Sequence, residues 1–206
     1  DGEGKRQGFL TTFLRLHDCN IRCSYCDTLY SYGPESTFES MSVQAVADVI
    51  EQLENHRITI TGGEPLLQES AIIELIDELT RRNARYDFNI ETNGTIIPSF
   101  HRDNVWFTYD YKTPSSLAED AMNLDIFKVA TPADIIKFVV GSMQDLDRMD
   151  EILKTYPTDA QIFVSPVWGN IEGATIIEYM KAHNWQNVRF QLQIHKFIWD
   201  PDAKGV

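Results

Sequence analysis

The stretch Asp18-Cys19-Asn20-Ile21-Arg22-Cys23-Ser24-Tyr25-Cys26-Asp27-Thr28 contains all three cysteines of this 206-residue chain, in the spacing C-x3-C-x2-C. Three closely spaced thiolates can ligate three corners of a [4Fe-4S] cube, which leaves the fourth iron without a protein ligand. Such an open iron can bind a substrate or a cofactor, whereas a cluster with four cysteine ligands mainly carries electrons. The spacing therefore predicts an open-site iron–sulfur cluster held by Cys19, Cys23 and Cys26.

Three other uses of these cysteines are open at this point. A structural zinc site normally has four protein ligands, and His17 is the neighbouring residue that could complete one. A disulfide would leave one odd cysteine and would need an oxidising compartment. The thiols could also be ordinary buried side chains. The close spacing of all three cysteines favours the cluster over each of these alternatives.

Composition limits the classes of function. The chain is 43% hydrophobic and of a length that fits one domain spanning residues 1–206. With 18 basic and 31 acidic residues its net charge is −13, which argues against nucleic acid as a partner, because binding the phosphate backbone needs a basic surface. The densest basic run is Arg81, Arg82 and Arg85, at the end of a predicted helix where cations interact favourably with the helix dipole.

The compartment is predicted from two absences in the sequence. No run of 18 apolar residues is present, so we expect no membrane span. No signal peptide is recognised, and together with the thiolate-rich motif this predicts a reducing cytoplasm. The chain begins at Asp1 rather than at a methionine, inside a glycine-rich stretch, so we expect a few residues to precede it.

The order of the predicted elements indicates the fold class. Strands are expected at residues 8–16, 57–61, 86–92, 105–109, 135–140, 161–164 and 188–192. Helices are expected at residues 42–54, with Ser42 as the N-cap, and at 70–82, 145–155 and 173–183. This alternation predicts an α/β fold with parallel strands and flanking helices. The chain is short for a complete eight-stranded barrel of ~250 residues, so we expect an incomplete, open TIM-like barrel.

Polar and glycine-rich segments follow several of the predicted strands. The ligand sites of parallel sheets gather where the carboxyl ends of the strands meet. We therefore expect these segments to form one site: the cysteine loop, Gly62-Gly63-Glu64, Glu91-Thr92-Asn93 and Ser165-Pro166.

The cysteine loop, placed after the first strand, resembles that of the radical S-adenosylmethionine (SAM) enzymes. Tyr25 matches an aromatic position common in that superfamily, and Thr61-Gly62-Gly63-Glu64-Pro65 resembles its GGE motif, whose backbone takes the amino end of SAM. The resemblance implies a radical SAM core with a [4Fe-4S] cluster and SAM as cofactors. It also implies that the reduced cluster cleaves SAM, so that a 5′-deoxyadenosyl radical abstracts hydrogen from the substrate.

Three further segments resemble one family, the 7-carboxy-7-deazaguanine synthases of the route to queuosine and other 7-deazapurines. These segments are Asp1-Gly2-Glu3-Gly4 with Phe13-Leu14-Arg15, then Cys26-Asp27-Thr28, and Gln193-Ile194-His195-Lys196-Phe197-Ile198-Trp199. The resemblance implies a carbon–nitrogen lyase that converts 6-carboxy-5,6,7,8-tetrahydropterin to 7-carboxy-7-deazaguanine with loss of ammonia. SAM is regenerated, and Mg²⁺ assists the rearrangement.

The same resemblance assigns roles to individual residues. Thr28 is expected to give Mg²⁺ a hydroxyl oxygen, the kind of ligand that this hard cation prefers. The residues expected to bind the substrate are Gly2, Glu3, Arg15, Thr61 and His195. The residues expected to bind SAM are Tyr25, Cys26, Asp27, Gly63, Asp110, Tyr111, Lys112, Ser165, Pro166, Val167 and Trp168, and residues 91–93 are expected to line the same pocket.

Partners follow from the family as well: a small-molecule pterin, a flavodoxin-like reductant and a second copy of the chain in a homodimer. Two departures concern SAM, because many members have Ser-Pro-Lys where this chain has Asp110-Tyr111-Lys112, and Gln-Pro where it has Ser165-Pro166. One alternative is a radical SAM activating enzyme that places a glycyl radical on a partner protein. The other is a zinc or iron–sulfur scaffold without catalytic activity.

Overall fold

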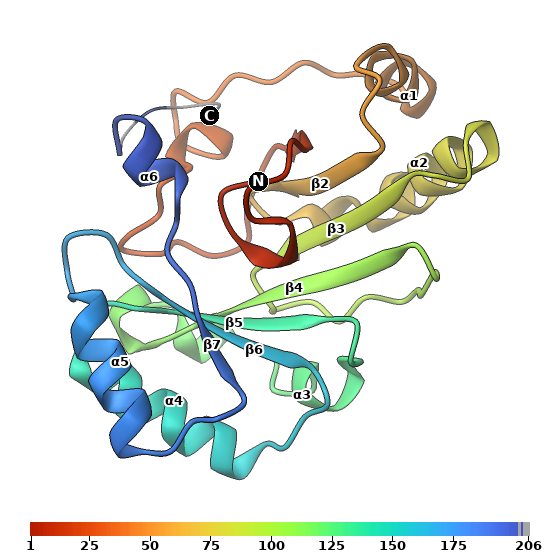
Figure 1. Cartoon of the computed structure of the whole chain (residues 1–206). Coiled ribbons are helices and arrows are strands. Elements are labelled where there is room, and N and C mark those ends of the chain that lie inside the picture. The colour runs from red at the N-terminus through yellow and green to blue at the C-terminus, as the bar shows by residue number, and fades with distance from the viewer. Residues whose placement is uncertain (202, 204–206) are drawn as a thin grey trace.

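The computed structural model describes residues 1–201 and 203, and its central feature is one parallel sheet (Figure 1). The strands lie side by side in chain order, so each neighbouring pair is joined by a crossover connection. Sequential parallel pairing, with no hydrogen-bonded pairing between the first and last strands of the described chain, is the predicted open barrel. The strands are β1 (Thr12–Leu16), β2 (Arg57–Gly62), β3 (Asp87–Thr92), β4 (Val105–Lys112), β5 (Ile135–Val140), β6 (Gln161–Pro166) and β7 (Val188–Phe190).

Helices cover the outside of this sheet (Figure 1). Ser42 caps the first of them as predicted, because its side chain accepts a hydrogen bond of 3.2 Å from the backbone N–H of Ala45. The α-helices are α1 (Val43–Gln52), α2 (Glu69–Arg82), α3 (Ile126–Val129), α4 (Met143–Thr155), α5 (Gly173–Ala182) and α6 (His195–Ile198). Short 3-10 helices are η1 (Gly4–Arg6), η2 (Leu29–Ser31), η3 (Pro65–Gln68), η4 (Pro114–Ser116) and η5 (Glu119–Ala121).

Alternate residues of each strand face two different environments. The outer face packs against the helices and forms the apolar core, with fully buried side chains such as Ile60, Ile90, Phe107, Phe138 and Val164. The opposite, inner face lines what we call the lumen of the open barrel. The lumen side chains are largely polar: Arg15, Thr59, Thr61, Asn89, Glu91, Thr108, Asp110, Lys112, Lys137 and Ser165.

Several strand boundaries differ from the prediction; β6 includes Ser165 and Pro166, which were expected to follow it, β7 ends at Phe190, and two further differences bear on the lumen. The first strand begins at Thr12 rather than at residue 8, because Gly8 has a φ of +88° and the preceding residues form turns. The fourth strand continues to Lys112, so residues 110–112 lie within β4 and not in the loop that follows it. The lumen therefore receives side chains directly from β4.

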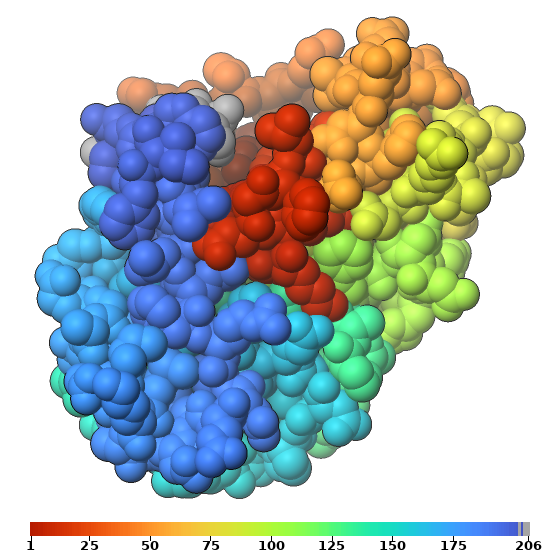
Figure 2. All heavy atoms as spheres, viewed as in Figure 1, coloured from red at the N-terminus to blue at the C-terminus, as the bar shows by residue number. Residues whose placement is uncertain are grey.

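The N-terminal segment, residues 1–9, closes the amino-terminal end of the lumen. Arg6 is buried and donates hydrogen bonds to the backbone oxygens of Ile58 (2.8 Å) and Asp87 (2.9 Å), and it is paired with the Asp87 carboxylate at 2.6 Å. Gly4 and the Gln191 side chain exchange hydrogen bonds of 2.7 and 3.0 Å. Figure 2 shows this segment (red) wedged between the C-terminal part of the chain (blue) and the first strands. It thus joins the two sides of the open barrel.

Candidate active site at the carboxyl edge of the sheet

The cysteine loop leaves β1 through a sharp backbone turn at Asp18. This residue has a φ of +79°, a left-handed conformation that is uncommon outside glycine. Hydrogen bonds fix it on both sides: its N–H donates to the carbonyl of Ser31 (2.9 Å), and its carbonyl accepts from the N–H of Glu64 (2.7 Å). The turn therefore places the cysteines over the carboxyl ends of β1 and β2.

Gly62 and Gly63 are glycines because the end of β1 and the start of the cysteine loop pass directly over them. Gly62 has a φ of +138°, and a Cβ on it would collide with the backbone of Leu16. A Cβ on Gly63 would collide with the carbonyl of Asp18. The resemblance implied that the backbone of these residues takes the amino end of SAM, and the structure adds that the chain's own backbone occupies the space that a Cβ would need.

Glu64, the third residue of the motif, is fully buried and ties two strand ends together. Its carboxylate accepts hydrogen bonds from the Leu66 N–H (2.9 Å), the Thr92 hydroxyl (2.8 Å) and the Asn93 N–H (2.7 Å). Burial raises the pKa of Glu64, and these donors oppose the rise. Glu64 therefore positions the ends of β2 and β3 from beneath the site, a role that its place in the sequence motif did not indicate.

The three cysteines are free and half-buried in this edge. The Cys19 sulfur accepts a hydrogen bond from the Asn93 amide at 3.7 Å, and burial raises the pKa of the Cys23 thiol, against the opposing charge of Lys112. In the described part of the chain, no three Cys, His, Asp or Glu side chains are arranged around one metal ion. A [4Fe-4S] cube does not need that arrangement, because each cysteine holds a separate iron.

His17, the conceivable fourth zinc ligand, is engaged elsewhere. Its Nε2 lies 2.9 Å from the hydroxyl of Ser36, and its ring centroid lies 4.4 Å from that of Phe38. The donor set of the loop is therefore three thiols, the set expected for a cluster with one iron free of protein ligands.

The remainder of the cysteine loop docks on β5 and on the segment after β4. Tyr25 donates from its hydroxyl to the carbonyl of Val139 (3.3 Å), and Ser24 donates from its backbone to Ser116 (2.9 Å). Thr28 precedes η2, but its hydroxyl does not cap that helix and lies 3.5 Å from the Cys26 sulfur. The Thr28 hydroxyl is therefore directed at the cysteine motif.

Five ionisable side chains meet in the lumen beneath the loop. Asp110 and Lys112 are paired at 2.8 Å, and Lys137 is paired at 2.8 Å with Glu3 from the N-terminal segment. Burial opposes the charge of Lys112, yet the Asp110 carboxylate raises the pKa of this lysine. Burial and the charge of Glu3 raise the pKa of Glu91 to about 7, against the opposing Lys137.

Among the lumen residues assigned to SAM, two buried oxygens have no hydrogen-bond partner in the described chain: Asp110 Oδ1 and Ser165 Oγ. A buried polar atom without a partner is costly, so such atoms mark places where a ligand or water completes the hydrogen bonding. Both belong to the residues that the sequence assigns to SAM. The site therefore fits a ligand with several hydrogen-bond donors, such as the amino and hydroxyl groups of SAM.

The C-terminal segment brings His195 to the N-terminus. Gly2 lies so close to the imidazole of His195 that a Cβ would collide with it, and Ile194 donates its N–H to the Gly2 carbonyl at 3.0 Å. Lys196 lies 3.7 Å from the Asp27 carboxylate, which connects this segment to the cysteine loop. Burial lowers the pKa of His195, so the neutral imidazole is favoured.

The other residues assigned to the substrate or to SAM lie in different parts of the site. Arg15 pairs in register with Thr61 on the lumen face, and its guanidinium lies 5.4 Å from the ring centroid of Tyr30. Trp168 packs edge-on against Phe197, with ring centroids 5.0 Å apart. Pro166 ends β6, and Val167 follows it, donating its N–H to Val140 at 2.7 Å.

Tyr111 is the exception, because its side chain points away from the lumen. It is buried in the outer core against Phe138, at a ring distance of 4.9 Å, and its hydroxyl donates to Glu119 (2.9 Å). Within the SAM pocket only the backbone of Tyr111 is available. The reason is strand alternation, which sends Asp110 and Lys112 to one face and Tyr111 to the other.

Sequence reasoning missed Lys137. The available signal was a lone charge inside the apolar strand Ile-Ile-Lys-Phe-Val-Val, since a charged residue in a buried strand needs a partner.

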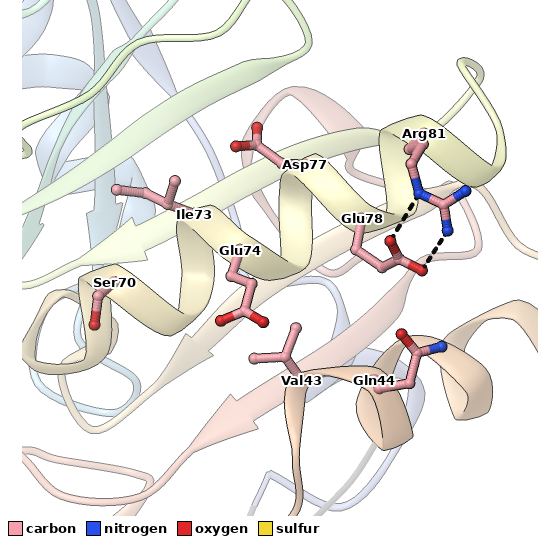
Figure 3. Close-up of a pocket in the computed structure, with 8 residues that line it drawn as sticks. All are labelled: Val43, Gln44, Ser70, Ile73, Glu74, Asp77, Glu78 and Arg81. Atoms are coloured by element: carbon pink, nitrogen blue, oxygen red, sulfur yellow. Dashed lines mark hydrogen bonds and ion pairs between the residues drawn. The ribbon is translucent and has the colours of Figure 1, made fainter.

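A hollow on the outer face, between α1 and α2, is also lined by charged side chains (Figure 3). There Glu78 is paired with Arg81 at 2.9 Å, and the helices separate the hollow from the lumen. It contributes nothing to the site.

Comparison with known proteins identifies the family. The family model described as the radical SAM superfamily matches residues 15–156, more than half of the chain. The 7-carboxy-7-deazaguanine synthase of Clostridium acetobutylicum is 36% identical over all of this chain and 95% of its own length. The 7-carboxy-7-deazaguanine synthase of Methanospirillum hungatei is 37% identical over 97% of this chain and 82% of its own length.

A solved structure agrees with these sequence relatives. The crystal structure of QueE from Escherichia coli superimposes with a TM-score of 0.65 and 26% identity, covering 93% of this chain and 88% of that one. The match extends over nearly the whole chain. The chain is therefore a member of the radical SAM superfamily and belongs to its 7-carboxy-7-deazaguanine synthase family.

Proposed function

We propose that this chain, acting as one domain, converts 6-carboxy-5,6,7,8-tetrahydropterin to 7-carboxy-7-deazaguanine with release of ammonia. One observation carries the proposal beyond family membership. Gly2, next to Glu3 at one end of the sequence, lies against His195 at the other end, and Lys196 contacts Asp27 of the cysteine loop. The segments that distinguish this family from other radical SAM enzymes are thus connected by contacts that run from the N-terminal segment to the cysteine loop.

The cluster, when bound and reduced, supplies the electron that cleaves SAM and so produces the radical that removes hydrogen from the substrate. The residues of the chain bind the cluster and SAM and orient them. Cys19, Cys23 and Cys26 would hold three irons. Asp110 Oδ1 and Ser165 Oγ would accept or exchange hydrogen bonds with SAM, because each is buried without a partner in the described chain.

The substrate would lie in the lumen below SAM. Glu3 and His195 are suited to its nitrogen-rich edge, because a carboxylate accepts hydrogen bonds from amino and ring N–H groups, and a neutral imidazole can donate or accept. The forked guanidinium of Arg15 suits its carboxylate. Thr61 shares the lumen face with Arg15 and would contact the same ligand.

Magnesium, the reductant and the dimer are finer parts of the proposal. The Thr28 hydroxyl would contribute an oxygen ligand to Mg²⁺, with water and substrate completing the shell. A flavodoxin-like protein would deliver the electron, and two copies of the chain would form a homodimer in the cytoplasm. In the described residues no helix has the length and apolar character needed to cross a membrane.

The test is an anaerobic product assay. The cluster is reconstituted, the protein is reduced, and SAM and carboxytetrahydropterin are added with Mg²⁺. We expect 7-carboxy-7-deazaguanine by mass spectrometry, with catalytic rather than stoichiometric use of SAM. Cleavage of SAM without this product would reject the substrate assignment. The glycyl-radical alternative would require activity only with a large partner protein, and no segment of the chain specifically favours it.

A further inference from the structure

Lys137 is a buried cation that none of the assigned roles uses. It lies in β5, where all six residues are buried, and its side chain is only 8% exposed. An ammonium group removed from water in this way must be paired with a negative charge to be tolerated. The position of Lys137 therefore indicates that the lumen requires a positive charge, and packing alone does not explain the residue.

The partner of Lys137 comes from outside the sheet. Its ammonium lies 2.8 Å from the Glu3 carboxylate, which is 17% exposed. Burial opposes the charge of Lys137, but Glu3, Asp110 and Glu91 raise its pKa, so the lysine carries its charge in the folded protein. This is the only ion pair that Glu3 makes among the described residues, and it anchors the carboxylate from the lumen side.

The backbone around Glu3 is held from the other direction. Gly2 accepts a hydrogen bond from Ile194 and lies close to the imidazole of His195. Gly4 exchanges two hydrogen bonds with the Gln191 side chain. The backbone of Glu3 is therefore fixed by the C-terminal segment, whereas its side chain is fixed by β5. The contact with Lys137 therefore sets the direction of the Glu3 carboxylate.

We propose that Lys137 is a positioning residue that aims the Glu3 carboxylate at the donor groups of the pterin ring. The proposal rests on the proposed function for the identity of that ligand. Lys137 does not touch the reacting atoms. It holds Glu3 so that one carboxylate oxygen meets the ammonium while the other faces the ligand, and its loss leaves the carboxylate free to turn toward water or toward another cation.

The experiment compares Lys137→Met with Lys137→Arg and with Lys5→Met in the reconstituted holoenzyme. Methionine keeps the length and apolar stem of lysine without its charge. Lys5 is a matched control, because it belongs to the same N-terminal segment but donates to the Ala133 carbonyl and not to Glu3. The affinity for 6-carboxypterin, a fluorescent unreactive analogue, is measured alongside KM, kcat and the affinity for SAM.

We expect Lys137→Met to weaken 6-carboxypterin binding and to raise KM by about tenfold or more, since a buried carboxylate loses its partner. The affinity for SAM and the electron paramagnetic resonance signal of the reduced cluster should stay unchanged. Lys137→Arg should restore part of the binding, and Lys5→Met should bind the analogue like the wild type.

A double-mutant cycle with Glu3→Gln separates positioning from general structural damage. If Lys137 acts through Glu3, the second substitution should add little once Lys137 is methionine. If the two substitutions weaken analogue binding independently, so that their effects multiply, the proposal is overturned. Unchanged analogue binding in Lys137→Met would overturn it as well. If the wild type binds the analogue but forms no product, the proposed reaction is rejected, and the double-mutant cycle can still be measured from analogue binding. If the wild type does not bind the analogue, the positioning role is rejected as well.

Discussion

The outer and inner faces of the same sheet have opposite chemistry. On the outer face, Phe138 and its neighbours are buried against helices, as in the core of any α/β protein. On the inner face, the same strands carry Asp110, Lys112 and Lys137 toward the lumen. A substitution on the outer face should therefore change stability, whereas one on the inner face or at its edge should change binding and turnover. The two faces can be tested separately.

The largest effect is expected at the cysteine loop. Cys23→Ala should abolish SAM cleavage and reduce the iron and sulfide content after reconstitution, because the cluster loses one of its three ligands. Metal analysis and detection of 5′-deoxyadenosine measure both. Ser24→Ala is the control, since it removes a neighbouring hydroxyl and no ligand. Retained cleavage in Cys23→Ala would contradict the assigned ligation.

On the outer face, Phe138→Ala should destabilise the protein by about 3–5 kcal/mol, because it leaves a cavity beside Tyr111 in a fully buried site. Urea denaturation of the cluster-free protein, followed by tryptophan fluorescence, gives the free energy of unfolding. At a temperature where this variant is folded, its affinity for SAM should match the wild type. A selective loss of SAM affinity without loss of stability would break the division between the faces.

Glu91 links the lumen to stability through pH. Its pKa is raised from an ordinary 4.5 to about 7, so between these values the folded protein keeps a proton that the unfolded chain has released. Stability contributed by this proton is therefore lost as pH rises from about 4.5 to about 7, and we expect a loss of roughly 2 kcal/mol.

Denaturation at pH 5 and pH 8 tests this expectation. Glu91→Gln should reduce the difference in unfolding free energy between the two pH values, since glutamine does not titrate. The same difference in the wild type and the variant would show that the carboxyl of Glu91 titrates normally.

At the edge of the lumen, Thr28→Ala should reduce the stimulation by Mg²⁺ by about tenfold, equivalent to about 1.4 kcal/mol, because one oxygen ligand is lost. Product formation as a function of Mg²⁺ concentration measures it. Thr28→Ser keeps the hydroxyl and should respond like the wild type. An identical Mg²⁺ response in Thr28→Ala would remove this residue from the metal site.

The smallest effect sharpens the comparison within the outer face itself. The Tyr109 hydroxyl is buried there without a partner among the described residues, whereas the Tyr111 hydroxyl donates to Glu119 at 2.9 Å. Tyr109→Phe should be neutral or stabilising by up to about 1 kcal/mol, and Tyr111→Phe should destabilise by about 1 kcal/mol. Thermal and urea unfolding compare the two, and equal losses would mean that Tyr109 has a partner, such as a buried water.

The sequence predicted the outer face better than the inner one. Apolar and β-branched composition indicated every strand, and helical periodicity indicated the four long helices, because the apolar side chains that produce these patterns are the ones that form the core. The first strand was predicted too long, since its apolar composition concealed the turn at Gly8. Strand β4 was predicted too short, because Asp110 and Lys112 interrupt the apolar pattern where β4 enters the lumen.

In the site, the sequence could indicate the motifs but not their mutual contacts. The cysteine spacing predicted the loop, and strand order predicted that Glu64 and Asn93 lie at the same edge. Neither showed that Glu64 accepts the Asn93 N–H, or that Glu3 reaches Lys137. Such contacts join residues far apart in the chain, and no local pattern encodes them.

The position of the N-terminal segment has a consequence for biosynthesis. Residues 1–9 leave the ribosome well before Gln191, which holds Gly4 from a position 187 residues later in the chain. The helices and outer face can form from contacts between consecutive elements, whereas the floor of the lumen cannot close until Gln191 has been synthesised. The nascent protein therefore passes through a stage in which a nearly finished barrel is still open at the end opposite its cysteines.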